Sequence, residues 1–225
     1  KGRINSEYGN WIIDPNVPFS FSDKDYHFSL EQHCWNEKEA TLCLGFDGKL
    51  ENADKFEFEL QNYDINKLGL ETANNLEIEG LLNIVSQVTW GKGQPLQLNS
   101  EVNITDGSAL IYNEEESSVA NFETLTMKVR LDESSLTVTT NIKSRELGGM
   151  TSDIRIDDIF DTRELSGEIN ITDIDLAFIE PLVYQVDVLN GVVSGAGIVG
   201  GTLNKPEVIG QFNVNNGYLA GDELP

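Results

Sequence analysis

The sequence predicts an all-β fold built from roughly a dozen or more short antiparallel strands. Apolar residues recur at every second position through most of the chain, as from Leu125 to Leu131, and this is the period of strands with one buried and one exposed face. Pairs that tolerate positive φ, such as Asp47-Gly48 and Asp106-Gly107, separate these segments and favour hairpin turns. No stretch keeps a helical period for long, so we expect little helix.

The first part of the chain begins irregularly and then alternates. Pro15 and Pro18 limit ladder pairing in residues 1–24. From Tyr26 the alternation leads to Cys34, and a second alternating segment, Leu42, Leu44 and Phe46, leads to the expected turn at Asp47-Gly48. Further strands follow, with a short helical segment expected between Asp64 and Leu70.

The two cysteines are expected to face each other across a hairpin. Eight residues separate Cys34 from Cys43, a spacing that suits facing positions of paired strands, and so short a loop gives about 2.5–3 kcal/mol of stabilisation when closed. Free or metal-binding thiols are the alternative, but two thiols are too few for a metal site, and His33 adjoins Cys34 and would point to the opposite face. A disulfide implies an oxidising compartment.

The second half contains the most regular strands and one ambiguous segment. Leu125 to Leu131 alternates cleanly with polar residues, and the meander continues past Gly148-Gly149. The segment from Asp173 to Leu182 fits either a strand or a short helical turn with Asp173 as the N-cap, and Pro181 favours the turn. The last strands run into an Asn216-Gly217 turn.

Parts of the sequence repeat at an offset of about 110 residues. Asp173-Ile174-Asp175 resembles Asp64-Ile65-Asn66, Gly191 matches Gly80, and the stretch 212–217 resembles 102–107. We therefore expect one segment of a longer repeating structure, with approximate units at 26–115 and 120–220.

Charge and hydropathy exclude several classes of function. The chain has 15 Lys and Arg against 38 Asp and Glu, a net charge of −23, which argues against binding a nucleic-acid backbone. No run of about 18 apolar residues could cross a bilayer as a helix. The N-terminal residues lack the features of a signal peptide, so we expect a segment of a longer protein whose anchor lies outside it.

Motifs for catalysis and cofactor binding are weak. Residues 195–200 match the dinucleotide fingerprint, but the sequence that follows cannot start the helix that the fingerprint needs. Asp153, Asp157, Asp158 and Asp161 lack the spacing of a calcium loop and are typical of a solvated face. Only two histidines could act as neutral bases and no nucleophile motif occurs, so we expect no enzyme activity, no cofactor and no metal site.

The apolar stripe admits two interpretations: the core of a closed two-sheet sandwich, or an open curved sheet whose apolar face binds something else. The mostly aliphatic stripe and the repeat favour the open groove. The residues that we expect to line it are Ile78, Leu82, Ile84, Val102, Ile104, Leu125, Met127, Val129, Leu131, Leu136, Val138, Ile169, Ile171, Val186, Val188, Phe212 and Val214.

Two motifs resemble those of a known family. The Gly-rich lead-in, the segment 201–206 (GTLNKP) and Gly210-Gln211-Phe212 resemble the "GTL..P...G" signature of the TamB family, which other AsmA-like, repeating β-groove proteins share. Cys34-Trp35 followed by Leu42-Cys43-Leu44 is similar to a Cys-Trp and Leu-Cys pair of the same family. Together they suggest an internal to C-terminal segment of such a protein.

This resemblance implies a fold, a location and a function. The implied fold is an elongated antiparallel sheet curved into an open hydrophobic groove, a β-taco. The implied location is the periplasm of a Gram-negative bacterium, with the parent protein anchored in the inner membrane. The implied function is phospholipid transport between the inner and outer membranes. The parent protein would also act with the Omp85-family protein TamA in the assembly of outer-membrane proteins and autotransporters. Phospholipid acyl chains and TamA are then the partners, with unfolded outer-membrane proteins as a further possibility. A chaperone groove for unfolded β-strands and a purely structural scaffold or adhesin are the alternatives.

Overall fold

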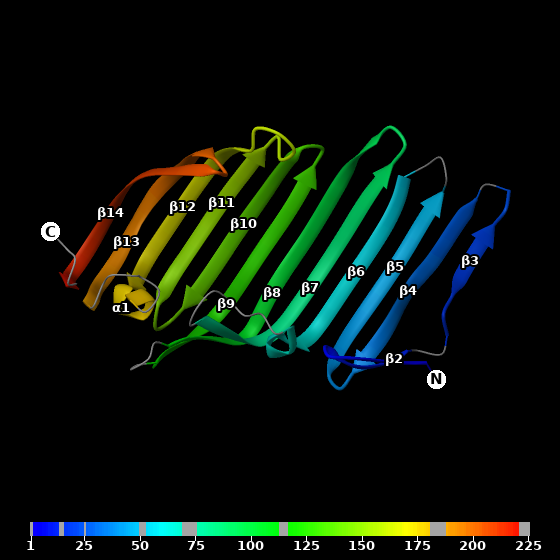
Figure 1. The fold of residues 1–225 in the computed structure, drawn as a ribbon, viewed down its shortest axis with the longest axis horizontal. Helices are drawn as coiled ribbons and strands as arrows, with labels where there is room; N and C mark the ends of the chain where they lie inside the picture. The colour runs from blue at the N-terminus through cyan, green and yellow to red at the C-terminus, as the bar shows by residue number, and fades with distance from the viewer. Residues whose placement is uncertain are drawn as a thin grey trace.

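The chain forms one antiparallel sheet of 14 strands (Figure 1). The computed structural model describes residues 2–13, 16–24, 26–49, 53–68, 76–112, 117–180 and 188–220. The strands are β1 (Arg3–Ser6), β2 (Gly9–Ile13), β3 (Phe19–Ser22), β4 (His27–Glu37), β5 (Ala40–Lys49), β6 (Ala53–Asp64), β7 (Leu76–Gly91), β8 (Gln94–Tyr112), β9 (Ser117–Asp132), β10 (Ser135–Ser144), β11 (Gly148–Asp157), β12 (Glu164–Asp175), β13 (Val188–Thr202) and β14 (Lys205–Ala220). A 3-10 helix, η1 (Ile65–Leu68), follows β6, and a single α-helical turn, α1 (Leu176–Ile179), follows β12.

Strand order follows chain order from β4 to β14, so every neighbour in this part of the sheet is the next strand in sequence. At the other end, two elements share the first edge of β4. β3 pairs with its first half, while β2 pairs with its last part through Ile12 and Ile13 and carries β1 beyond it. The prediction of an all-β fold with one or two short helical turns is confirmed.

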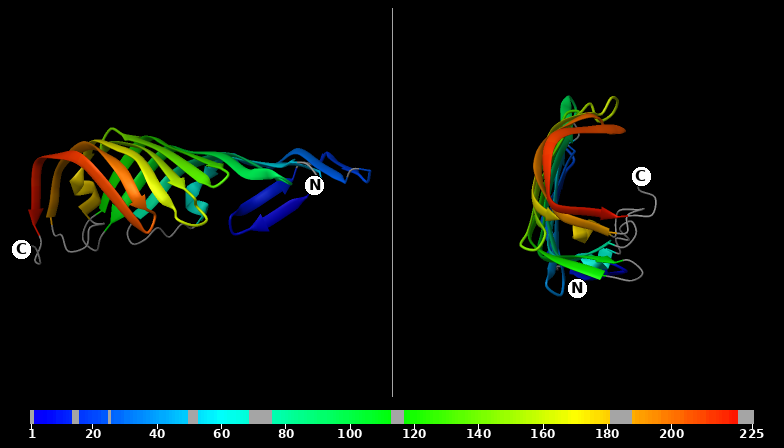
Figure 2. Two further views of the ribbon diagram at one scale, coloured as in Figure 1. Left: turned by 90° about the horizontal axis from the view of Figure 1, so that it is seen from above. Right: turned by 90° about the vertical axis from the view of Figure 1, so that its left-hand side faces the viewer.

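The sheet is strongly curved and remains open. Seen from one end, it forms an arch with a hollow side, and η1 and α1 lie on that side near one rim (Figure 2). β14 pairs only with β13, so the two ends of the sheet do not meet. The described residues form no second sheet, which excludes a two-sheet sandwich in this part of the chain. The predicted elongated groove is therefore present.

Three of the expected turns lie inside strands instead. Asp47-Gly48 belongs to β5, Asp106-Gly107 to β8, and Asn216-Gly217 to β14. Asp106 and Asn216 do have positive φ, at 49° and 54°. The positive φ serves a β-bulge rather than a hairpin, because the ladder loses register where these residues face Gly80 and Gly191.

A second kind of bulge precedes each helical turn. Asn62 and Asp173 both have positive φ, and their backbone N–H groups donate to side chains on the next strand, Asn83 Oδ1 at 3.0 Å and Ser194 Oγ at 2.9 Å. Asp175, not Asp173, caps α1, and its Oδ1 accepts a hydrogen bond from the Ala177 N–H. Asp173 cannot be the cap because it lies in this bulge.

The same strand, bulge and helical turn thus occur twice along the sheet. Asp64 plays the part of Asp175, since its Oδ1 accepts from the Asn66 N–H just as η1 begins. The exact units 26–115 and 120–220 stay a prediction.

The disulfide is confirmed. Cys34 and Cys43 are direct partners on β4 and β5 and are joined by an S–S bond of 2.03 Å. Their neighbours Trp35 and Leu42 pack against the main apolar cluster. Alternation therefore places the disulfide on the outer face, where it ties two strands together without occupying the groove.

Candidate functional site

The hollow face of the sheet carries the apolar stripe. Leu60, Leu82, Ile104 and Phe122 are buried in one cluster with Ile65 of η1. Because η1 lies on the hollow side (Figure 2), the side chains that contact it must point there too. The core of this protein is thus the floor of its own groove.

Pairing register extends this floor across the strands in rows. Leu82 faces Ile104, and Ile104 faces Leu125, while Val129 faces Val138 farther along. Alternation and register bring the following predicted groove residues to the hollow face: Ile78, Leu82, Ile84, Val102, Ile104, Leu125, Met127, Val129, Leu131, Leu136, Val138, Ile169, Ile171, Phe212 and Val214. Whether these side chains contact lipid stays a prediction.

Two predicted groove residues do not join this set. Val186 lies outside the described residues. In β7, Ile78 precedes the bulge opposite Gly80 and packs against the cluster on the hollow side. Leu189 has the same position relative to Gly191 in β13, and Val188 is its neighbour. Alternation therefore directs Val188 to the outer face. Sequence periodicity alone misses this because aliphatic residues occur at both even and odd positions of β13, so the pattern does not show which face is inward.

The first half of the floor is aromatic. Trp35, Phe58 and Tyr63 pack in or against the cluster, and Phe46 lies near Trp90 with ring centroids 6.3 Å apart. The aliphatic list above omits these residues. Their alternation in sequence was a usable signal, because Phe56 and Phe58 flank one outward residue and pair with Phe46 and Leu44.

In the last strands, glycines form part of the floor. Gly195 and Gly197 of β13 and Gly210 of β14 lie on the hollow side, and the ring of Phe212 covers them, since a Cβ at any of the three would come within 3.1 Å of that ring. Phe212 and Val214 are 39% and 52% exposed, whereas Leu82 is 5% exposed. The groove is thus filled by its own side chains near β7 and offers open apolar surface near β14.

Polar atoms occur at a few points of the hollow face. The hydroxyl oxygens of Ser86 and Ser100 lie 2.6 Å apart and share a hydrogen bond. His33 Nε2 and Trp35 Nε1 are buried without a hydrogen-bond partner in the described part of the chain. Thr140 and Ser152 add hydroxyls to this face, because they pair with each other and with Met127 and Ile169. Most of the described floor is apolar, which suits an aliphatic occupant better than a polar one.

A network at one rim fastens the β1–β2 hairpin to the sheet. Trp11 stacks on Tyr63 with centroids 6.0 Å apart, and the Tyr63 hydroxyl donates to the Tyr8 carbonyl at 2.7 Å. Lys67 Nζ forms an ion pair with the buried carboxylate of Glu37 at 2.6 Å, and this hydrogen bond raises the pKa of Lys67. Burial raises the pKa of the Tyr63 hydroxyl. The hairpin thereby lies across the first end of the sheet (Figure 1).

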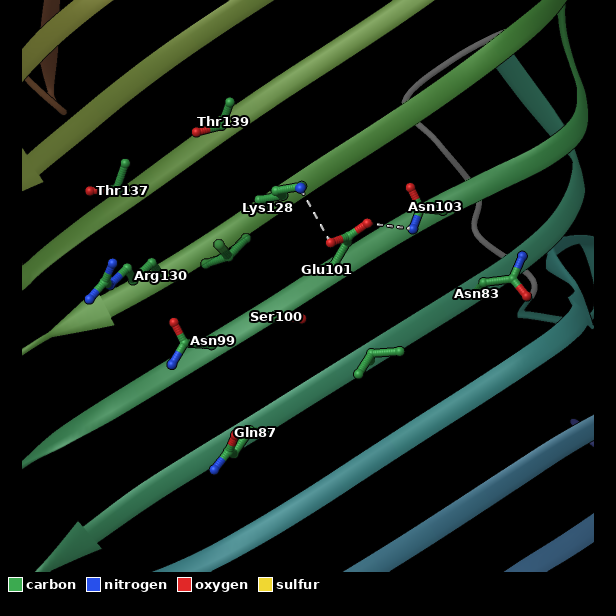
Figure 3. Close-up of a pocket in the computed structure, with 12 residues that line it drawn as sticks. Asn83, Gln87, Asn99, Ser100, Glu101, Asn103, Lys128, Arg130, Thr137 and Thr139 are labelled. Carbon is green, nitrogen blue, oxygen red and sulfur yellow. Dashed lines mark hydrogen bonds and ion pairs between the residues drawn. The ribbon is translucent and has the colours of Figure 1, made fainter.

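The outer face is polar and carries a shallow hollow of about 720 Å³ over β7 to β10 (Figure 3). Its side chains include Asn83, Asn99, Lys128 and Arg130. Lys128 lies 3.4 Å from a carboxylate oxygen of Glu101. A hydrogen bond from Asn103, together with this cation, lowers the pKa of Glu101.

Other candidate sites do not assemble. Residues 195–200 form part of β13, so the dinucleotide fingerprint has no helix after it. Among the described residues, no three acidic, histidine or cysteine side chains come together in a way that could hold a metal ion. Within the same residues, no helix is long and apolar enough to span a membrane.

Comparison with known proteins identifies the family. The model described as "TamB, N-terminal domain" matches residues 1–214. Its description points to the N-terminal domain, whereas the motifs suggested an internal to C-terminal segment. No solved structure matches the chain.

One curated relative is the translocation and assembly module subunit TamB of Haemophilus influenzae, which is 25% identical over 220 residues. This alignment covers 95% of the chain but only 16% of the relative's length. The chain is therefore similar to one part of a much longer protein. The match of the family model over nearly the whole chain, together with an open curved sheet, shows that this chain belongs to the TamB family.

Proposed function

We propose that this chain is one segment of a periplasmic conduit that carries phospholipid between the inner and outer membranes. The observation that supports this most is the continuous apolar floor on the hollow side of a sheet that no second sheet covers in the described residues. Acyl chains lie on this floor while head groups stay in water at the open side. Each buried methylene contributes about 0.8 kcal/mol.

The arrangement favours movement over tight binding. Apolar rows cross consecutive strands, so an acyl chain that leaves the apolar residue of one strand meets an equivalent residue on the next strand. Burial of apolar surface is not directional, and no step along such a floor requires the loss of a specific hydrogen bond. The parent protein acts with TamA in the assembly of outer-membrane proteins and autotransporters, as a component of transport and not as an enzyme.

Photo-crosslinking tests this proposal at adjacent residues of one strand. A photoreactive amino acid at Met127 or Val129, on the hollow side, should crosslink to phospholipid in cells, and the same group at Lys128 should not. Mass spectrometry of the natively purified chain should find bound phospholipid. Crosslinks to lipid from Lys128 alone, or a lipid-free protein, would contradict the conduit.

A substitution tests transport itself. Met127→Asp should block passage without unfolding the sheet, because Met127 is only half-buried, while Lys128→Asp should leave passage intact. Two outcomes support other functions. Crosslinks from the hollow face to unfolded outer-membrane proteins rather than lipid favour a chaperone groove, and no crosslinks of either kind favour a structural scaffold.

A further inference from the structure

The outer face carries a row of uncharged polar side chains that register aligns across six consecutive strands. Asn83 pairs with Asn103, Asn103 with Thr126, Thr126 with Asn141, Asn141 with Thr151, and Thr151 with Asn170. We call Asn83, Asn103, Thr126, Asn141, Thr151 and Asn170 the amide row. Adjacent strands lie about 4.7–4.9 Å apart, so the row presents one hydrogen-bonding group at each such step along the sheet.

The absence of charge in this row contrasts with the rest of the chain. The protein carries a net charge of −23, and the neighbouring outward row includes Glu101, Lys128, Asp153 and Glu168. A track of amides and hydroxyls six strands long therefore stands out from an acidic surface. Such a track favours a neutral polar polymer, which loses no ionic hydration when it binds.

Hydrogen-bonding capacity is available in the second half of the row. At the first end, Asn83 accepts from the Asn62 N–H and donates to the Leu81 carbonyl. Thr126 donates to Asn103 Oδ1 at 2.7 Å, and Asn103 Nδ2 donates to Glu101, so this end is held in a fixed orientation. Asn141, Thr151 and Asn170 are exposed and make no side-chain hydrogen bond in the described part of the chain. Each amide offers donors and an acceptor, and each hydroxyl offers both, which matches the acetamido and hydroxyl groups of an amino sugar.

The shallow hollow begins at the row, which contributes Asn83 and Asn103 to its lining, and extends past Glu101 and Lys128 to a cationic group without a partner. Arg130 lines it between Asn99 and Thr137, and the Arg130 guanidinium makes no ion pair or hydrogen bond with any described residue (Figure 3). A free guanidinium in so acidic a protein favours a carboxylate, which it can bind through two parallel hydrogen bonds. Val85 is exposed and supplies an apolar contact for a sugar ring.

We propose that the amide row, with Arg130 at the far side of the hollow that adjoins it, binds an extended glycan of N-acetylated amino sugars that carries occasional carboxylates. The alternation of each strand places this site on the face opposite the apolar floor, so the proposal does not depend on what the groove transports. A phospholipid fits this face poorly because Val85 is the one apolar side chain that lines the hollow from the outer face. A nucleic acid is excluded by the charge.

Calorimetric titration of the 225-residue chain with defined oligosaccharides tests the site. Chitotetraose, a neutral N-acetylated glycan, should bind, and cellotetraose, which has the same backbone without acetamido groups, should bind at least several-fold more weakly. Asn141→Glu should lower the affinity for chitotetraose about three- to tenfold, the effect of one or two neutral hydrogen bonds. The matched control is Ser166→Glu, which adds the same charge at an exposed outward position off the row.

Arg130 is tested separately with a glycan of the same backbone in which alternate sugars carry a lactyl carboxylate. Arg130→Gln should weaken binding of this probe about tenfold or more and leave chitotetraose binding unchanged. Arg155→Gln is the control, because Arg155 is an outward cation already paired with Asp157 at 2.8 Å. Equal affinity for chitotetraose and cellotetraose, or equal effects of Asn141→Glu and Ser166→Glu, would overturn the proposal. Lipid crosslinking from Met127 would be unaffected by either result.

Discussion

At the scale of single residues, position along a strand decides whether an apolar side chain stabilises the fold. Leu82 is 5% exposed and packs in the cluster beneath η1, while Val85, three residues later on β7, is 58% exposed on the outer face. Both residues are aliphatic and both lie in the same strand. The difference between them comes entirely from the alternation of the strand.

Truncation of these two side chains should therefore have very different effects. Leu82→Ala should lower the free energy of unfolding by about 2–5 kcal/mol because it removes buried contacts and leaves a cavity. Val85→Ala should change it by less than about 0.5 kcal/mol. Urea unfolding followed by far-ultraviolet circular dichroism measures both, and equal effects would show that the floor does not act as the core.

Most outward and inward assignments follow from sequence, but those of β13 do not. Met127 and Val129 alternate with Lys128 and fall on the hollow side as the pattern predicts. Val188 lies five residues before Val193 on the same strand and therefore on the opposite face, but aliphatic residues occupy both faces of β13, so the pattern does not show which face is inward. Which face of such a strand is inward depends on how it pairs with its neighbours, and local periodicity does not contain that information.

At the scale of elements, glycines mark places where strands approach closely or bend. Gly148 opens β11 with φ of 77°, and a Cβ there would lie 2.2 Å from the Thr172 carbonyl oxygen on β12. Gly93, between β7 and β8, has nearly the same φ of 75° but nothing within 4 Å of a Cβ. The two glycines share a left-handed backbone conformation, and they differ in whether the surroundings leave room for a Cβ.

Alanine substitution at these glycines separates strain from collision. Gly93→Ala should cost about 1–2 kcal/mol, the penalty of a left-handed conformation for a residue with a Cβ. Gly148→Ala should cost clearly more, because the Thr172 carbonyl belongs to a paired strand and must move. Denaturant unfolding of the two variants compares them. If Gly93→Ala were the more damaging change, β11 and β12 would not pack as described.

The elements illustrate both the reach and the limit of sequence reasoning. Two short helical segments were expected and are present, yet Asp106-Gly107 and Asn216-Gly217 form bulges and not hairpin turns. Both structures need a residue with positive φ, so Asp-Gly or Asn-Gly is compatible with either. Only the length of the strand that follows distinguishes them, and that length is fixed by its neighbours in the sheet.

At the scale of the whole molecule, the stability of this acidic chain depends on pH through its exposed carboxylates. Hydrogen bonds and nearby cations lower the pKa of Glu101, Glu123, Glu146 and Asp157 in the folded chain. For Glu123, the hydrogen bond from Arg145 is the largest cause. A carboxyl whose pKa is lower in the folded state contributes stability above its unfolded pKa and loses that contribution as the pH falls.

The melting temperature should therefore fall as the pH drops below about 4.5, the ordinary pKa of Glu. Glu123→Gln should reduce the size of this fall, and the effect should shrink in high salt because these groups are exposed. Glu133→Gln, at an exposed position, provides the control. A melting temperature that rises below pH 4.5 would contradict the pKa directions. Thermal scans between pH 3 and pH 7 supply the test.

The choice between an open groove and a closed sandwich needed the structure. An apolar stripe at every second position fits both folds, and the stripe of Leu125 to Leu131 would look the same in either. What decides is how the strands are ordered, and here nearly every strand pairs with its neighbours in sequence. A meander of this kind extends one sheet instead of building two.

The uneven distribution of tryptophan residues makes intrinsic fluorescence a probe of one end of the sheet. All three tryptophans, Trp11, Trp35 and Trp90, belong to the strands before β8, so their intrinsic fluorescence senses only that end. Circular dichroism averages over the entire ladder. Because each strand contacts mainly its neighbours, unfolding can begin at one end of the sheet and proceed strand by strand. Emission and ellipticity that change at different denaturant concentrations would reveal which end melts first.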